Sequence, residues 1–146
     1  MRRAILIVIG VIGAVLLAIQ LVPVERSNPP VVADFDGPPA VEAVLRASCY
    51  DCHSNETAWP WYSRVAPVSW LVARDVEEGR SRLNLSSWGH QEPKRQAKLA
   101  EEIWEEVAEG EMPLRAYRLA HPDARLDEAG MATLRVWAEA MESRFD

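Results

Sequence analysis

Two cysteines and a histidine in the first half of the chain form the pattern Cys49-Tyr50-Asp51-Cys52-His53. A C-x-x-C-H run is the attachment signature of c-type haem. The spacing suits that chemistry, because two thiols must reach two vinyl groups of one macrocycle and the following imidazole must turn onto the iron as proximal ligand. The sequence therefore predicts one covalently bound haem c, with thioethers at Cys49 and Cys52 and with His53 on the iron.

Three other interpretations of these residues compete with haem. A redox-active dithiol of the thioredoxin kind needs strands alternating with helices, and the strand signal here is weak. A zinc site would usually bring a second C-x-x-C or a paired histidine, and the sequence offers neither. A plain structural disulfide is the third. The chain has only two cysteines, so the motif leaves no thiol for a separate disulfide or a Cys-rich metal site.

The second axial ligand decides what the iron can do, and four possibilities stay open. Met112 is the preferred candidate, because it lies in a loop between two expected helices and a proline stiffens that loop. The alternatives are His121, His90 and an iron without a second protein ligand. His121 could equally belong to a structural turn, with its imidazole hydrogen-bonded. Met131 and Met141 recur at helical spacing, so we expect them in the core.

The elements that must position these residues are expected to be helices. The first predicted helix, residues 40–48, leads into the motif, and the second, residues 67–76, stops near Gly79. The third covers residues 93–109 and ends at Gly110. The last helix has Asp127 as its N-cap. The apolar stripes expected to be buried are Leu99, Ile103, Trp104 and Val107, and then Met131, Leu134, Trp137, Ala138 and Met141. Helix follows helix without alternating strands, so the predicted fold class is all-α.

An uncharged apolar run from Ala4 to Val22 follows Arg2 and Arg3. Its length is close to the roughly 20 residues that cross a bilayer, and the two arginines should hold the N-terminus in the cytoplasm. We therefore predict a signal-anchor transmembrane helix over 1–22 in the cytoplasmic (inner) membrane, with the rest on the periplasmic, extracytoplasmic side. A cleavable signal peptide is the alternative, but the run is longer than a usual h-region and no small-x-small site follows it.

Residues 23–39 predict a linker, because five prolines forbid regular helix and favour extended backbone. At about 3.1 Å per residue, this stretch could hold the domain up to roughly 50 Å from the membrane. The alternative is that it wraps the domain surface. The haem-binding domain is then expected over 40–146.

Composition limits the partners. About half of the residues, 49%, are hydrophobic, so a core can form, and we expect most of the six tryptophans to be ordinary core and rim aromatics. Beyond Val22 the chain has 14 Lys plus Arg and 22 Asp plus Glu, a net charge of −8. This balance argues against nucleic acid. It suits steering toward a basic patch on a redox partner protein, although solubility alone would explain it.

The motif and several further blocks resemble the small exported family of haem-binding domain proteins, which is built on one cytochrome c-type motif. The blocks that carry the resemblance are residues 48–57, 59–63, 67–71, 79–80, 83–86, 110–113, Tyr117, 121–126 and the final Trp-bearing helix. The resemblance covers most of the chain after residue 39. It implies haem binding and not a particular reaction.

More distantly, the order helix, C-x-x-C-H, Met-Pro loop and terminal helix resembles cytochrome c, in which the first and last helices pack together and a methionine is the distal ligand. We therefore expect a cytochrome c-like helical domain after the transmembrane helix, serving as a monohaem electron carrier and not as an enzyme. The alternative is a haem-based ligand sensor or a peroxidase-like haem enzyme with an open or displaceable distal site. His121 and Arg125 would be the groups available to such an enzyme.

Overall fold

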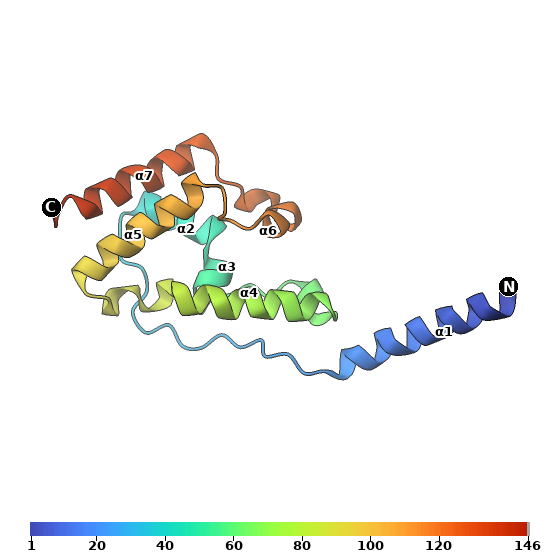
Figure 1. Cartoon of the computed structure of the whole chain (residues 1–146). Helices are drawn as coiled ribbons and strands as arrows, with labels where there is room; N and C mark the ends of the chain where they lie inside the picture. Colours follow the sequence, from blue (N-terminus) through green and yellow to red (C-terminus); the bar gives the residue numbers. More distant parts are fainter. Residues whose placement is uncertain (146) are drawn as a thin grey trace.

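The computed structural model describes residues 1–145, and within that range its regular structure is helical throughout (Figure 1). The α-helices are α1 Arg2–Ala18, α2 Pro39–Ser48, α3 Tyr50–His53, α4 Val68–Arg82, α5 Pro93–Ala108, α6 Arg115–Ala120 and α7 Glu128–Glu142. The 3-10 helices are η1 Ile19–Leu21, η2 Trp61–Arg64, η3 Leu85–His90 and η4 Pro122–Ala124. The prediction of an all-α fold with an N-terminal apolar helix is confirmed.

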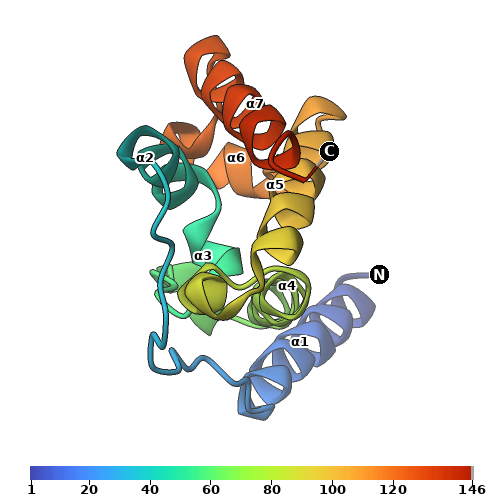
Figure 2. The same cartoon turned by 90° about the vertical axis from the view of Figure 1, so that its left-hand side faces the viewer.

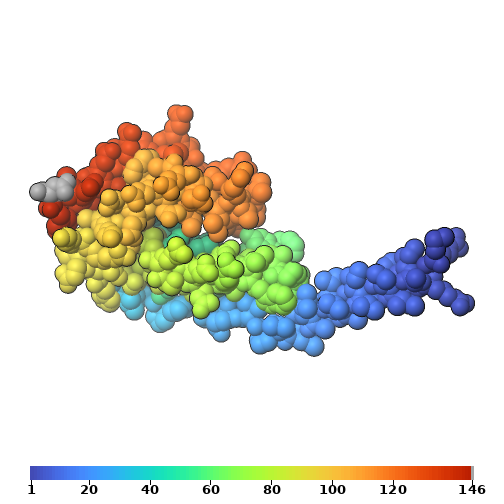
Figure 3. Space-filling view, in the orientation of Figure 1, coloured from blue at the N-terminus to red at the C-terminus, as the bar shows by residue number. Residues whose placement is uncertain are grey.

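Helix α1 projects away from the rest of the chain (Figures 1 and 3). Together with η1 it makes a 20-residue helical stretch, Arg2–Leu21, with a mean hydropathy of 2.9 and no buried residues. At 1.5 Å per residue, 20 residues cover the roughly 30 Å of a bilayer's hydrocarbon core. Length and composition therefore allow it to cross a membrane, and a signal sequence would pass the same test.

The domain core lies where α2 and α5 pack against α7 (Figure 2). Leu45, Leu85 and Leu134 are its most completely buried large side chains. The residues of the two predicted apolar stripes are buried, except that Trp104 and Met131 are only partly so.

The ends of the helices follow from local chemistry. Asp127 caps α7, because its Oδ1 accepts a hydrogen bond from the Gly130 amide at 2.7 Å. Pro39 occupies the first turn of α2, where its missing N–H costs nothing. Gly110 has a φ of 78°, a left-handed conformation that stops α5 as predicted.

Two expectations about the helices were wrong. The helix after residue 67 does not stop near Gly79 but continues to Arg82, because Gly79 adopts helical geometry and its lack of a side chain lets α4 pack closely on α3. In addition, α6 follows the Met-Pro loop, where no separate helix was predicted.

The Pro-rich segment wraps the domain, which is the second of the two arrangements that the sequence left open. The amides of Val32 and Ala33 both donate to the carbonyl of Ser86, at 3.1 and 3.0 Å. Phe35 is buried, with its ring centroid 5.3 Å from that of Trp88. Residues 23–39 therefore contribute to the folded domain and do not act as a spacer.

Candidate functional site

One turn of helix carries the C-x-x-C-H motif. Cys49 is the N-cap of α3, and its carbonyl accepts hydrogen bonds from the amides of Cys52 at 3.2 Å and of His53 at 2.9 Å. The two thiols and the imidazole are thus held on a single short turn. This is the local arrangement that two thioethers and one axial ligand require.

The ring of His53 is oriented by α4. Its Nδ1 lies 3.0 Å from the carbonyl oxygen of Gly79 and 3.2 Å from that of Leu83. A carbonyl only accepts, so Nδ1 carries the proton and Nε2 presents its lone pair. Burial lowers the pKa of His53, which keeps the imidazole neutral at neutral pH. A neutral ring with Nδ1 fixed by a carbonyl is the form in which histidine binds a metal.

The other ring nitrogen of His53 is available. Within residues 1–145, Nε2 makes no hydrogen bond. No fully buried side-chain nitrogen or oxygen in the described chain lacks a partner, so Nε2 is not sealed inside the protein. Nε2 of the largely buried His53 therefore keeps some solvent exposure.

Gly79 makes the approach of α4 to the motif possible. A Cβ atom at this position would lie 2.5 Å from the carbonyl oxygen of Cys52 and 3.2 Å from its Cβ. Such distances are far inside van der Waals contact, so only glycine fits. Because Gly79 has no side chain, α4 lies close enough to α3 for the Gly79 carbonyl oxygen to accept a hydrogen bond from His53 Nδ1.

Both motif cysteines are free thiols, and their environment favours the protonated form. Burial raises the pKa of Cys49 to about 12, with a smaller contribution from Cys52. Burial raises the pKa of Cys52 to about 11, and the negative charge of Asp51 adds to it. Redox-active dithiols work through a lowered thiol pKa. The dithiol interpretation therefore has no support here.

The motif residues do not form a zinc site. Over residues 1–145, no group of three or more His, Cys, Asp or Glu side chains is placed to hold a metal ion. Cys49, Cys52 and His53 share one turn without converging on a common point. A tetrahedral zinc centre would need that convergence.

Asp51, between the two cysteines, ties the motif to its surroundings. Its Oδ2 accepts a hydrogen bond from the Tyr117 hydroxyl at 2.7 Å, and its Oδ1 accepts one from the Ala58 amide at 2.9 Å. The first bond joins α3 to α6 across 66 residues of sequence. The Met-Pro loop leads directly into α6, so this bond also fixes that loop relative to the haem motif.

The two alternative histidines differ in environment. His121 stacks on Tyr117, with ring centroids 4.4 Å apart and planes at 19°, and its Nε2 lies 2.6 Å from the Tyr62 hydroxyl. His121 is thus held by two tyrosines, as in the hydrogen-bonded turn considered above. His90 is exposed at the end of η3.

Met112 lies on a loop that α5 holds firmly. Its amide donates to the carbonyl of Glu106 at 3.0 Å, and its side chain is partly buried against the core that Cys49 also contacts. The negative charge of Glu106 raises the pKa of His53, which opposes the larger effect of burial. Met112 is thus fixed to the end of α5 through its backbone.

A cavity of about 530 Å³ adjoins Met112. Leu126 and Met131 contribute apolar walls, and the cationic residues among its lining are Arg115, Arg118 and Arg125. The Arg125 Nε donates to the backbone carbonyl of Arg118 at 3.3 Å. Within residues 1–145, no hydrogen bond joins Arg125 to His121.

The comparison with known protein families matches residues 14–140 of this chain to the family described as haem-binding domain. The chain belongs to the haem-binding domain family. The match includes the whole motif, all of α4 to α6 and most of α7. Neither the curated proteins nor the solved structures gave a match.

The residues of this haem-binding domain fit the group that its family name implies. His53 offers an accessible Nε2 on a neutral ring, and two free thiols lie on the same turn. Met112 stands on a separate, well-fixed loop. The structure places the three motif residues together on one turn, whereas His90 is exposed at the end of η3.

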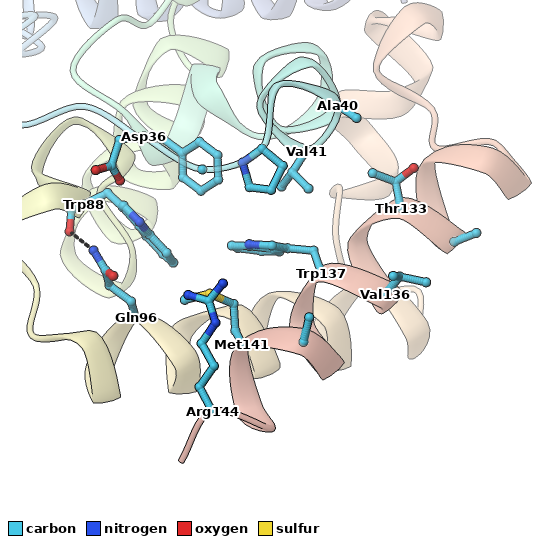
Figure 4. A pocket seen from close by; sticks show the side chains of 15 residues that line it. Asp36, Ala40, Val41, Trp88, Gln96, Thr133, Val136, Trp137, Met141 and Arg144 are labelled. Carbon is cyan, nitrogen blue, oxygen red and sulfur yellow. Dashed lines mark hydrogen bonds between the residues drawn. The ribbon is translucent and has the colours of Figure 1, made fainter. Parts of the chain in front are cut away.

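A larger hollow, of about 860 Å³, lies elsewhere (Figure 4). Phe35, Trp88 and Trp137 line it, and none of the motif residues does. Trp88 and Trp137 are buried and pack with ring centroids 5.8 Å apart. These aromatics belong to the protein core, as expected for most of the tryptophans, and they give no support to a second haem site.

Sequence reasoning missed the residues that orient His53. Gly79 and Leu83 act through backbone carbonyls, which any residue type can supply, so composition held no signal for them. Tyr117 and Tyr62 carry a signal in the sequence only through the resemblance. Their partners are 66 and 59 residues away, beyond any local spacing rule.

Proposed function

We propose that this haem-binding domain protein is a membrane-anchored monohaem c-type cytochrome that transfers electrons outside the cytoplasmic membrane. One observation carries the proposal most strongly. His53 is a neutral imidazole whose Nδ1 is fixed by Gly79 and Leu83, and its accessible Nε2 sits on the same turn as two free thiols. A haem iron supplies a one-electron couple between its ferric and ferrous states.

Covalent attachment asks little of the protein beyond positioning. Each thiol sulfur of Cys49 and Cys52 would form one S–C bond to a vinyl carbon, and the thiol hydrogen would go to the neighbouring vinyl carbon. Atoms and electrons balance without an oxidant. Protonated thiols, which the raised pKa values of both cysteines favour, supply the hydrogen for this addition.

Met112 is the proposed distal ligand. Its loop is held by α5, and the Asp51–Tyr117 hydrogen bond fixes the following helix to the motif. His121 is the alternative ligand, but its Nε2 would have to leave Tyr62 to bind iron through that nitrogen. Thioether ligation raises the reduction potential relative to a second imidazole, which suits an electron carrier.

The proposed partner is a redox protein in the periplasm or membrane. The net charge of −8 beyond Val22 favours a partner with a basic surface. Helix α1 is the proposed single-pass anchor, with Arg2 and Arg3 on the cytoplasmic side. We propose no enzymatic activity for the domain.

The experiment that tests covalent attachment uses full-length protein produced together with a cytochrome c maturation system. The colour should stay with the protein through acid–acetone extraction, and the intact mass should include one haem. Cys52→Ala should leave one thioether at most, whereas His53→Ala should keep both thioethers and lose the proximal nitrogen. Colour that extracts from the unaltered protein would disprove covalent attachment.

A visible spectrum separates the carrier from the alternative. An iron with His53 and Met112 as its two protein ligands should be low-spin when reduced and should not respond to carbon monoxide. A haem sensor or peroxidase-like enzyme would instead bind carbon monoxide at an open or displaceable position. Rapid binding in the unaltered protein would therefore favour the alternative function.

A further inference from the structure

The first turns of α4 and the 3-10 helix η2 expose apolar side chains beside the end of α1. Trp61 is 78% exposed and Leu71 is 57% exposed, and Val65, Val68 and Trp70 between them are exposed as well. We call these five residues the anchor-side patch. Soluble domains rarely leave large apolar side chains gathered in one place without a partner.

The chain itself fixes the patch to the end of α1. The side-chain amide of Gln20 donates to the carbonyl of Ala66 at 3.1 Å and accepts from the amide of Ala66 at 2.9 Å. A few residues on, Arg26 donates to the carbonyl of Ser63 at 3.1 Å. Figures 1 and 3 show α1 leaving the domain beside η2 and the beginning of α4. The C-terminal end of the apolar stretch Arg2–Leu21 therefore lies beside the anchor-side patch.

The exposed surface of α4 changes character with distance from α1. Its first exposed positions after Val68 are Trp70 and Leu71. The next exposed positions are charged, and Arg74 pairs with Glu78 at 3.2 Å. The exposed apolar side chains of α4 thus lie only at its end nearest α1. Apolar residues scattered at random over the surface would not be confined to one end of the helix.

We infer that the anchor-side patch lies in the outer interface of the lipid bilayer that α1 crosses, so that the haem domain rests on the membrane. This inference depends on the proposed anchoring by α1. A span of 20 residues ends near Leu21, at the level where aromatic side chains favour the membrane–water boundary. Trp61 combines an apolar ring with an indole N–H, the combination that this boundary selects.

Lipid cross-linking tests the inference on the full-length, haem-loaded protein. The protein is placed in nanodiscs of phosphatidylcholine and phosphatidylglycerol that contain a phospholipid with a diazirine near its headgroup. After irradiation, peptides are mapped by mass spectrometry. We expect cross-links in residues 1–22 and in residues 61–71, and none around Val136, an equally apolar residue on α7 that is 59% exposed.

A double variant, Trp61→Glu with Leu71→Glu, should lose the cross-links in residues 61–71 and keep those in α1. Val136→Glu is the matched control and should change neither set. An unchanged haem spectrum shows that each variant is folded. Cross-links in α1 without any in 61–71 would overturn the patch and leave the anchor standing, as when the patch binds another protein. Cross-links in 61–71 without any in α1, or cross-links in neither segment, would overturn the anchor together with the inference that rests on it.

Discussion

Replacing Gly79 by alanine tests the contact that orients His53. In a helix interior, glycine-to-alanine changes normally stabilise a protein by roughly 0.4 to 1 kcal/mol, because the unfolded chain loses freedom. Here the added Cβ would lie 2.5 Å from the Cys52 carbonyl oxygen, so α4 must move away from α3. The two effects have opposite signs, and the sign of the measured change shows which one wins.

The magnitudes favour the steric effect. Forcing an extra carbon into a well-packed site costs about 1 to 3 kcal/mol. After subtracting the usual gain, Gly79→Ala should lower the free energy of unfolding by roughly 0 to 2.6 kcal/mol, with a middle value of about 1.3 kcal/mol. Urea unfolding, followed by tryptophan fluorescence and by haem absorbance, measures this change.

The same movement should reach the iron. Retreat of α4 lengthens the 3.0 Å contact between His53 Nδ1 and the Gly79 carbonyl, while the Leu83 carbonyl can still accept. A weaker hydrogen bond makes the imidazole less basic, which favours ferrous iron and raises the potential. A lost bond worth about 0.5 to 1.5 kcal/mol corresponds to at most roughly 60 mV for a one-electron couple.

Gly89→Ala is the control. Its Cβ would lie 3.2 Å from the Ala33 Cβ, a milder contact that involves no motif residue. It should cost less stability than Gly79→Ala and leave the potential alone. If Gly79→Ala stabilises the protein and leaves the potential unchanged, α4 does not pack on the motif as described, and the orientation of His53 needs another cause.

The remaining predictions concern the distal side and the topology. Met112→Ala should abolish the weak far-red charge-transfer band of ferric iron and open the iron to carbon monoxide, whereas Met131→Ala should lose only stability, toward the lower end of roughly 2 to 5 kcal/mol. An unchanged spectrum in Met112→Ala would refute the ligand. Tyr117→Phe removes a hydrogen bond to the Asp51 carboxylate, so the free energy of unfolding in urea should fall by about 1 to 2 kcal/mol. On heating, this variant should lose the far-red band at a lower temperature than the unaltered protein does. Tyr50→Phe should leave the band unchanged. A reporter at the C-terminus should be active only outside the cytoplasm, and the protein should resist a salt wash of membranes; a soluble form lacking α1 would indicate cleavage.

Local patterns predicted most of the helical framework. The stripes around Leu99 and Leu134 are buried because apolar residues at helical spacing must find a common core. Asp127 and Gly110 mark helix ends because their effects depend only on neighbouring backbone. These features need no knowledge of distant contacts.

The failures share one cause, which is tertiary contact. Glycine weakens isolated helices, so the sequence alone predicts a stop near Gly79. In the folded chain it lies against Cys52, and the close packing outweighs the propensity. The sequence can show that a glycine is present, but the reason for it lies in a partner 27 positions earlier.

The segment at 23–39 makes the same point at larger scale. Its prolines correctly excluded helix, but proline content says nothing about whether an extended chain stands free or lies on a surface. Phe35 enters the core, and Asn55 donates to the Pro30 carbonyl at 2.9 Å. A single buried aromatic and a few backbone contacts thus converted a predicted spacer into part of the domain.

One side chain connects that segment to the haem motif. Arg80 donates a hydrogen bond to the carbonyl of Ser54, the residue that follows His53, at 2.7 Å. It also donates to the carbonyl of Ser27 at 2.9 Å. Its Nη2 also reaches the Thr57 hydroxyl at 2.9 Å. Arg80 is next to Gly79 on α4. The same stretch of helix therefore orients His53 and binds the segment 23–39 through the Ser27 carbonyl. The fold therefore sets the distance between the haem motif and the proposed anchor.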